Sequence, residues 1–174
     1  MPGSHMNTVI LIGVPGAGKS TVGVILAKTL GMNFIDTDIA IQERTGKLLQ
    51  ELIDEKGADE FLKIEENTVL SLDADNTVIA TGGSVVLSDR AMNYLKSKGI
   101  VLYLDISFEE MVRRLNDITS RGIVLFRGQG LSDMYDQRSP LYEKYADIRV
   151  DCSDGDFERI LDTIVGEIKK ACGG

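Results

Sequence analysis

The segment TVILIGVPGAGKS, residues 8–20, carries most of what the sequence says about the architecture of this protein. Its first half is a continuous apolar run, typical of a strand buried on both faces of a parallel sheet. Its second half, GVPGAGKS (13–20), matches the phosphate-loop pattern G-x-x-x-x-G-K-[ST]. Residues 18–30 follow with helical spacing of the apolar side chains Val22, Ile25, Leu26 and Leu30. A strand, a glycine loop and a helix in this order make the phosphate-loop match credible.

The phosphate loop predicts binding of a nucleoside triphosphate. Glycines allow a tight turn that points several backbone N–H groups at one anion, and the helix N-terminus adds partial positive charge. Lys19 supplies a full charge to the β- and γ-phosphates, and the Ser20 hydroxyl can ligate Mg²⁺. The loop residues assigned to ATP are Gly13, Pro15, Gly16, Ala17, Gly18, Lys19, Ser20 and Thr21. The loop alone does not identify the reaction, because several classes of ATPase, GTPase and kinase share it.

Outward from this segment, strand-like and helix-like segments alternate along the chain. The expected strands are residues 8–13, 32–36, 77–81, 100–106 and 147–151. The expected helices are residues 18–30, 38–72 with breaks at Gly46 and Gly57, 88–98 stopped by Gly99, about 107–116, and about 156–171. SFEE (107–110) has the form of a capping box, with Ser107 and Glu110 as its two members. This alternation predicts an α/β fold of three layers, with a five-stranded parallel sheet between helices.

Length and composition limit the class of protein. A chain of 174 residues with 43% hydrophobic residues suits one domain with a buried core. MPGSHM (1–6) is typical of a vector-derived tag. Without it, residues 7–174 are expected to form a single domain. No apolar run approaches the roughly 18 residues of a membrane span. The net charge of −8 disfavours nucleic-acid binding and polybasic membrane binding.

The rare reactive side chains narrow the chemistry. His5 is the only histidine and lies in the expected tag, so a histidine base, a histidine metal site and a Ser-His-Asp triad are excluded. Cys152 and Cys172 lack the spacing of a metal site or a disulfide framework. We therefore expect two reduced thiols in a cytoplasmic protein. No heptad or apolar stripe stands out, which favours a monomer.

FIDTD (34–38) places two carboxylates, Asp36 and Asp38, at the end of the second expected strand. Residues i and i+2 of a strand point to the same face, so both side chains are expected at the sheet edge where open α/β folds bind ligands. One aspartate can serve Mg²⁺ while the other takes a proton from an alcohol. The alternative is that Asp38 only caps the following helix. The phosphate loop favours the functional pair.

NDITSRGIVLFRGQG (116–130) fits neither a helical nor a strand period. A long irregular stretch inside a compact domain is usually functional or mobile. We interpret it as a lid that spans about residues 116–131.

These segments together resemble the shikimate kinase family, small P-loop kinases of the nucleoside monophosphate kinase type. The resemblance covers residues 7–171 and rests on GVPGAGKST (13–21), FIDTDIAIQERTG (34–46), FLKIEEN (61–67), ATGGS (80–84), SRGIV (120–124) and RSPLYEKYADIRVD (138–151). It implies that helices within about residues 38–72 bind the acceptor. It also implies ATP-dependent phosphorylation of shikimate to shikimate 3-phosphate, a step of aromatic amino-acid biosynthesis.

The resemblance implies roles for the carboxylates and the glycine turn. Asp36 would lie in the outer shell of Mg²⁺, and Asp38 would take the proton of the acceptor hydroxyl. Gly82 and Gly83 would offer backbone N–H groups to the acceptor. The alternative for the two glycines is an ordinary turn at the end of a strand.

Three arginines complete the implied site. Arg138 would clamp the acceptor carboxylate by a bidentate pair, unless it forms a surface ion pair with Glu143 or a neighbour. Arg121, in the lid, would stabilise charge on the phosphates in the transition state, unless it is a solvated loop residue. Arg114 resembles the arginine that stacks on adenine, with Arg113 adjacent to it.

The sequence departs from the family where the acceptor is read. The family pattern F-R-x-x-E has an arginine, a second clamp on the shikimate carboxylate, where this chain has Leu62. Lys63 is adjacent, but one helical step rotates a side chain by about 100°. The glycine turn also reads GGS instead of GGG. Loss of one charge-assisted contact costs about 1.5–3 kcal/mol, so the pattern fits a weaker shikimate kinase or an acceptor whose apolar part meets Leu62.

Two classes of function follow. The leading hypothesis is an ATP- and Mg²⁺-dependent kinase for an alcohol on a small carboxylate-bearing metabolite, with shikimate as the leading acceptor. Another hydroxy acid or an amino-acid alcohol such as homoserine is the alternative acceptor, whereas a nucleoside monophosphate is disfavoured because residues 38–72 are mainly acidic. The second class is a non-catalytic ATP-binding regulator, against which four intact residues argue: Lys19, Ser20, Asp38 and Arg121.

Overall fold

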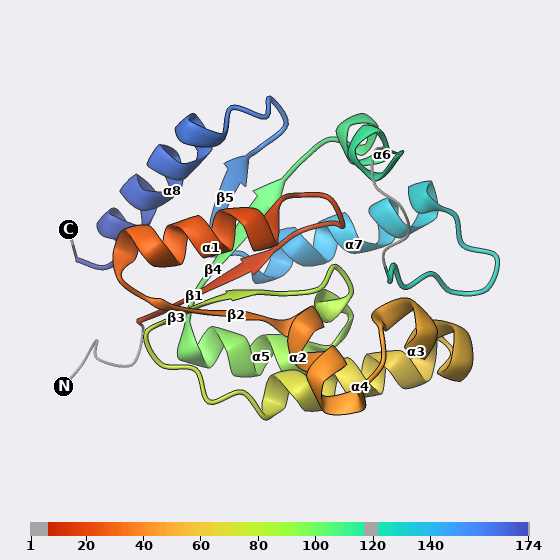
Figure 1. Cartoon of the computed structure of the whole chain (residues 1–174). Helices are drawn as coiled ribbons and strands as arrows, with labels where there is room; N and C mark the ends of the chain where they lie inside the picture. Colours follow the sequence, from red (N-terminus) through yellow and green to blue (C-terminus); the bar gives the residue numbers. More distant parts are fainter. Residues whose placement is uncertain (1–6, 117–121, 174) are drawn as a thin grey trace.

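The computed structural model describes residues 7–116 and 122–173, and it contains a parallel sheet of five strands with helices on both faces (Figure 1). The strands are β1 (Thr8–Ile12), β2 (Asn33–Asp36), β3 (Thr77–Ala80), β4 (Gly99–Asp105) and β5 (Ile148–Asp151). The helices are α1 (Lys19–Leu30), α2 (Thr37–Thr45), α3 (Leu49–Lys56), α4 (Ala58–Leu70), α5 (Asp89–Lys98), α6 (Phe108–Asn116), α7 (Leu131–Tyr145) and α8 (Phe157–Ala171), with a 3₁₀ helix η1 (Val85–Leu87). The predicted three-layer fold is confirmed. The expected tag, residues 1–6, lies outside the described residues.

The sheet has the strand order β2-β3-β1-β4-β5, and every pairing is parallel. All five residues of β1 are buried, as its continuous apolar run predicts. Figure 1 shows α1 and α8 on one face of the sheet and α5 on the other. Within the described residues, no helix is both long enough and apolar enough to cross a membrane.

Helix α1 buries a narrower face than the sequence predicts. Val22 and Leu26 are buried and Leu30 is half-buried, but Ile25 is 37% exposed. The buried face is centred on Val22, Leu26 and the small residues Gly23 and Ala27. Ile25 shares the side of the helix that its spacing predicts, but it lies at the edge of the buried face.

Two residues or motifs predicted to mark the end or the start of a helix, Gly99 and SFEE, have different contacts in the structure than the sequence predicts. Gly99 ends α5 as its C-cap, as predicted, but its backbone is extended (φ −178°) and not left-handed, and it is also the first residue of β4. A Cβ at Gly99 would stand 1.7 Å from the carbonyl oxygen of Thr8, so glycine is needed there for the close approach of β1. In SFEE, the Ser107 hydroxyl accepts from the Glu110 N–H at 3.1 Å. The Glu110 carboxylate bonds to the arginines of α6 instead, so only half of the capping box forms.

Helix α7 was not predicted from the sequence, and it contains Pro140, a residue that normally breaks a helix. The helix nevertheless continues from Leu131 to Tyr145. Met134, Arg138 and Tyr142 are spaced four residues apart and are fully buried against the rest of the chain. The packing of this face stabilises the helix despite the proline.

The helices α2, α3 and α4, which the family resemblance predicts to bind the acceptor and which are called the acceptor helices, form a small core of their own beside the sheet. The predicted breaks at Gly46 and Gly57 end α2 and α3. The buried side chains of this second core are Ile41, Leu49, Leu52, Phe61 and Val124. Val124 comes from the expected lid, so the described part of the lid packs on the acceptor helices.

Candidate active site

The phosphate loop joins β1 to α1, as predicted, and Lys19 is the first residue of α1. Lys19 is buried, and its Nζ donates to the carbonyl oxygens of Gly13 (2.5 Å) and Val14 (2.9 Å). Burial lowers the pKa of Lys19 to about 8, although the nearby carboxylate of Asp38 acts in the opposite direction. The carbonyl groups of the loop therefore bind the ammonium group of Lys19, which the sequence analysis predicts to bind the phosphates of the nucleotide.

A cavity of about 240 Å³ opens beside this loop. It is lined by segments that lie far apart in the sequence: the loop and the start of α1, Asp38 of α2, Phe61 and Glu65 of α4, the turn from Thr81 to Ser84, Leu115, residues 122–124 of the lid, and Arg138 of α7. The cavity therefore brings together residues predicted for phosphate binding, proton transfer and acceptor binding. It also brings in Glu65 and Ser84, to which the sequence analysis gave no role.

Asp36 has two tasks in the structure. It is the last residue of β2 and the N-cap of α2, and its Oδ1 accepts from the backbone N–H groups of Asp38 (2.9 Å) and Ile39 (3.3 Å). Its Oδ2 accepts from the Ser20 hydroxyl at 2.6 Å. Asp36 thus joins the helix start to the residue predicted to ligate Mg²⁺.

The prediction that Asp36 and Asp38 project from one strand is wrong. Helix α2 begins at Thr37, so Asp38 lies in the first turn of a helix. The suggestion that Asp38 caps this helix is also wrong, because Asp36 is the cap. Asp38 nonetheless lines the cavity, and burial, with Asp36 nearby, raises its pKa to about 6.

The turn after β3 needs glycine at position 82, because two carboxylates crowd it. A Cβ at Gly82 would stand 2.8 Å from both Asp38 Oδ1 and Glu65 Oε2. The Gly82 N–H donates to the Thr37 hydroxyl at 3.1 Å, so one of the two predicted acceptor-binding groups is already engaged. The neighbouring Gly83 is held through its carbonyl oxygen, which accepts from the Tyr142 hydroxyl at 2.5 Å.

Glu65 is the site residue that the sequence analysis missed. Only 2% of it is exposed, and its Oε1 accepts from the Ser84 hydroxyl at 2.8 Å. Its Oε2 has no hydrogen-bond partner among the described residues. Burial raises the pKa of Glu65 to about 7 against the opposing effect of the Ser84 hydrogen bond. Glu65 follows Phe61 by four residues on one buried face of α4, a signal present in FLKIEEN.

Arg138 is fully buried, which rules out the alternative of a surface ion pair. Its Nη2 donates to the Val124 carbonyl at 2.5 Å, and its Nε lacks a hydrogen-bond partner within the described part of the chain. Burial lowers the pKa of Arg138, and Tyr142 and Glu65 partly offset this effect. A buried guanidinium that lines a cavity suits a carboxylate ligand.

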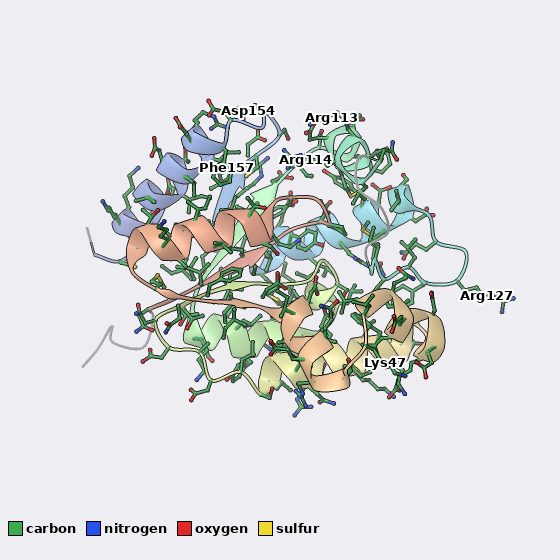
Figure 2. All side chains as sticks on the ribbon, in the orientation of Figure 1. Lys47, Arg113, Arg114, Arg127, Asp154 and Phe157 are labelled. Atoms are coloured by element: carbon green, nitrogen blue, oxygen red, sulfur yellow. The ribbon has the colours of Figure 1, made fainter. Side chains whose placement is uncertain are left out.

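A second cavity, of about 430 Å³, lies on the other side of the phosphate loop. Figure 2 shows Arg113 and Arg114 of α6 and Phe157 at the start of α8 around it. Arg114 is fixed in place, because it donates to the carbonyl oxygens of Gly16 (3.0 Å) and Cys152 (2.9 Å) and to Glu110 (2.8 Å). The two cavities share three lining residues of the loop region: Gly16, Gly18 and Thr21.

The predicted lid arginine, Arg121, lies outside the described residues. The other arginine of this segment, Arg127, is exposed and points away from the body of the protein (Figure 2).

Comparisons with known proteins agree with this geometry. A family model described as "Shikimate kinase" matches residues 15–169. The shikimate kinase of Clostridium botulinum (strain Eklund 17B / Type B) is 40% identical over 166 residues, which cover 94% of this chain and 96% of that protein. The chain belongs to the shikimate kinase family. The shikimate kinase of Haemophilus influenzae (strain PittEE) is 37% identical over 174 residues, with 98% and 97% covered.

Solved structures of shikimate kinases share the fold. The structure described as shikimate kinase from Acinetobacter baumannii in complex with shikimate has a TM-score of 0.85 and 29% identity, covering 97% of this chain and 96% of that one. Shikimate kinase from Aquifex aeolicus has a TM-score of 0.80 and 32% identity, covering 96% and 99%. The family makes this chain an ATP-dependent kinase that acts on an alcohol group.

Leu62, the departure from the shikimate kinase pattern, is not brought to the acceptor cavity. Among the described residues, those lining the cavity do not include Leu62, which packs half-buried against the core of the acceptor helices. Lys63 points outward near Glu60, with 74% of its side chain exposed. The helical rotation predicted this outward direction. An apolar acceptor group touching Leu62 is therefore not supported by the geometry.

The residues predicted for Mg²⁺ fit the ion chemically. Ser20 and Asp36 offer a hydroxyl and carboxylate oxygens, the ligand types that Mg²⁺ prefers. The described residues contain no cluster of three or more His, Cys, Asp or Glu side chains suited to a metal. A kinase does not require such a cluster, because Mg²⁺ usually takes one or two protein oxygens together with water and the phosphates of the nucleotide.

Proposed function

We propose that this chain transfers the γ-phosphoryl group of ATP to a hydroxyl of shikimate, giving shikimate 3-phosphate and ADP. The observation that carries the proposal is the single cavity lined by Lys19, Asp38 and Arg138, in a chain of the shikimate kinase family. These three side chains supply a phosphate ligand, a base and a carboxylate ligand. A family member from Acinetobacter baumannii that shares the fold was solved with shikimate bound.

ATP binds across the phosphate loop in this proposal. Its adenine occupies the larger cavity, against the fixed guanidinium of Arg114, with Arg113 at the rim. Its phosphates replace the carbonyl oxygens of Gly13 and Val14 as partners of Lys19. The anionic phosphates raise the pKa of Lys19 again and keep the amine charged during transfer.

Asp38 serves as the general base. The acceptor hydroxyl oxygen attacks the γ-phosphorus, the bond to the β,γ-bridging oxygen breaks, and the hydroxyl proton moves to the Asp38 carboxylate. A pKa of about 6 suits this role, because the group is mostly ionised near pH 7.5 and is still a better base than an exposed aspartate. Arg138 and the turn at Gly83 hold the acceptor's carboxylate and ring in place.

Ser20 and Asp36 would hold Mg²⁺ with their hydroxyl and carboxylate oxygens, and the hydrogen bond between the two side chains keeps these oxygens together. When bound, Mg²⁺ neutralises charge that develops on the phosphates. Arg121 of the lid adds a second positive charge to the phosphates in this proposal. We also expect a monomer, which size-exclusion chromatography with light scattering would test. The cytoplasmic location inferred from the cysteines stays a prediction.

The test is an ADP-release assay with ATP and Mg²⁺, in which shikimate and homoserine are compared side by side. We expect release with shikimate and none above background with homoserine. Absence of release with shikimate would refute the proposal. Release with homoserine alone would assign the amino-acid alcohol, and nucleotide binding without any release would favour the non-catalytic regulator.

Asp38→Asn tests the base. We expect a loss of kcat of about 10²- to 10⁴-fold, with ATP affinity nearly unchanged, because only proton transfer is removed. Glu43→Gln is the matched control, since Glu43 is exposed on the same helix α2. A variant Asp38→Asn with normal kcat would show that another group accepts the proton.

A further inference from the structure

Two serine–glutamate pairs connect the segment after β3 to helix α4. The Ser84 hydroxyl donates to Glu65 Oε1 at 2.8 Å, and the Ser88 hydroxyl donates to Glu66 Oε2 at 2.5 Å. The first pair lines the acceptor cavity, and the second is not part of the cavity lining. The pairs therefore have similar chemistry but different surroundings.

Glu65 binds Ser84 through only one of its two carboxylate oxygens. Oε1 is held by Ser84, whereas Oε2 has no hydrogen-bond partner among the described residues. Oε2 lies 2.8 Å from the point where a Cβ of Gly82 would stand, the same separation as Asp38 Oδ1. The free oxygen of Glu65 thus lies close to the base, at the turn predicted to touch the acceptor.

A purely structural role does not explain this arrangement. A buried carboxylate with an unsatisfied oxygen is unfavourable for folding, and a buried polar atom without a partner usually signals a function or a ligand. Only 2% of Glu65 is exposed, although the residue lines the cavity. A hydrogen-bond donor on the acceptor would satisfy this oxygen.

The donor to Glu65 comes from the turn after β3 and not from α4 itself. Leu62, three residues before Glu65 on α4, is at the spacing of a helical neighbour but offers no donor. The hydroxyl that binds Glu65 belongs to Ser84.

We propose that Ser84 is a positioning residue for the acceptor, because its hydroxyl holds one oxygen of Glu65 and so directs the other to accept a hydrogen bond from an acceptor hydroxyl group. The ligand class is a polyhydroxylated carboxylate: Arg138 takes the carboxylate, Asp38 the reacting hydroxyl, and Glu65 a second hydroxyl. This inference rests on the proposed function, since it concerns the same cavity.

The charges around Glu65 predict what removal of the Ser84 hydroxyl does. Asp38 of α2 disfavours the ionised form of Glu65, whereas Lys19 of α1 and Arg138 of α7 favour it. The phenol of Tyr142, also on α7, faces the same group and is neutral, since burial raises its pKa. Because the Ser84 hydrogen bond opposes the effect of burial, its loss raises the pKa of Glu65 above about 7.

The test uses Ser84→Ala, with Ser88→Ala as the matched control and Ser84→Gly as a second variant that restores the family's turn sequence. In ligand-free protein labelled with ¹³C at glutamate side chains, the Glu65 signal is assigned with Glu65→Gln and titrated by NMR. We expect its midpoint to move to higher pH in both Ser84 variants and to stay unchanged in Ser88→Ala. An unchanged midpoint in the Ser84 variants would overturn the inference.

Steady-state kinetics supply the second readout. We expect KM for shikimate to rise about 10- to 100-fold in the Ser84 variants, while KM for ATP changes little, and the acidic limb of kcat/KM moves to higher pH. Equal changes in the two KM values would indicate a general structural defect and contradict the inference. If the wild-type chain does not phosphorylate shikimate but the NMR midpoint still shifts, the proposed function fails and the Ser84–Glu65 coupling stands.

Discussion

The two sides of the active-site cavity are built in different ways. The phosphate-binding part of the nucleotide side is one continuous segment, residues 8–20, in which strand, loop and helix follow one another. The acceptor side is assembled from α4, the turn after β3, and α7, which lie far apart in the sequence. A local segment can be recognised from its sequence pattern, whereas an assembled surface depends on how distant segments pack.

The two sides also differ in how their polar groups are satisfied. Lys19 on the nucleotide side has two carbonyl partners within the loop. On the acceptor side, Glu65 Oε2 and Arg138 Nε lack hydrogen-bond partners among the described residues. In the proposed function, the acceptor side keeps these groups ready for a ligand at a cost in folding stability, a common feature of active sites.

Removal of the Lys19 ammonium group is expected to have the largest effect on activity, and it tests the nucleotide side. We expect Lys19→Ala to lower kcat/KM by more than about 10³-fold, because the phosphates lose their fixed positive charge in a buried site. The matched control is Lys28→Ala, on the exposed face of the same helix. Turnover within tenfold of the wild type would mean that Lys19 does not contact the transferred phosphate.

Loss of the acceptor-side cation comes next and should separate the two sides. We expect Arg138→Met to raise KM for shikimate about 100-fold, since a buried charge-assisted pair is lost, with KM for ATP nearly unchanged. Glu143→Gln, exposed on α7, is the control. An Arg138→Met variant in which both KM values rise together would indicate that the two sides are not independent.

Glu65→Gln should increase stability while it lowers activity. The pKa of Glu65 is raised from 4.5 to about 7 in the folded protein, so its contribution to stability is fully present below pH 4.5 and is lost as pH rises through about 7. We expect Glu65→Gln to stabilise the ligand-free protein at pH 8 by about 3 kcal/mol, and by little at pH 4.5. Urea denaturation at both pH values measures the free energy of unfolding. An equal increase at pH 8 and pH 4.5 would show that the stabilisation does not come from removal of the ionised Glu65 carboxylate.

Leu62→Arg is expected to have the smallest effect. Leu62 does not line the cavity, and Glu65 Oε1 is already bound by Ser84. We therefore expect KM for shikimate to change by less than about threefold in the wild-type background and to recover partly when Leu62→Arg is added to Ser84→Gly. An equal gain in both backgrounds would show that an arginine at position 62 reaches the acceptor without involving Glu65.

Sequence patterns were most reliable where structure is local. The phosphate loop, the five strands and the breaks at Gly46 and Gly57 follow from apolar runs, glycines and spacing within short windows. They failed where a distant contact overrides a local rule. Pro140 suggests a break, but the buried face of α7 keeps the helix intact. Gly99 ends α5 as predicted, but the sequence does not show that the close approach of β1 also requires glycine there.

The sequence by itself determined the fold class, the family and the identity of the nucleotide side, because these depend on residues that are neighbours along the chain. Only the tertiary structure decided that Asp36 caps α2 while Asp38 lines the cavity, and that Glu65 is held by Ser84. It also decided that Arg138 is buried and that Leu62 is not at the cavity. The physical reason is that burial and hydrogen-bond partnership are set by contacts between segments, which no single segment encodes.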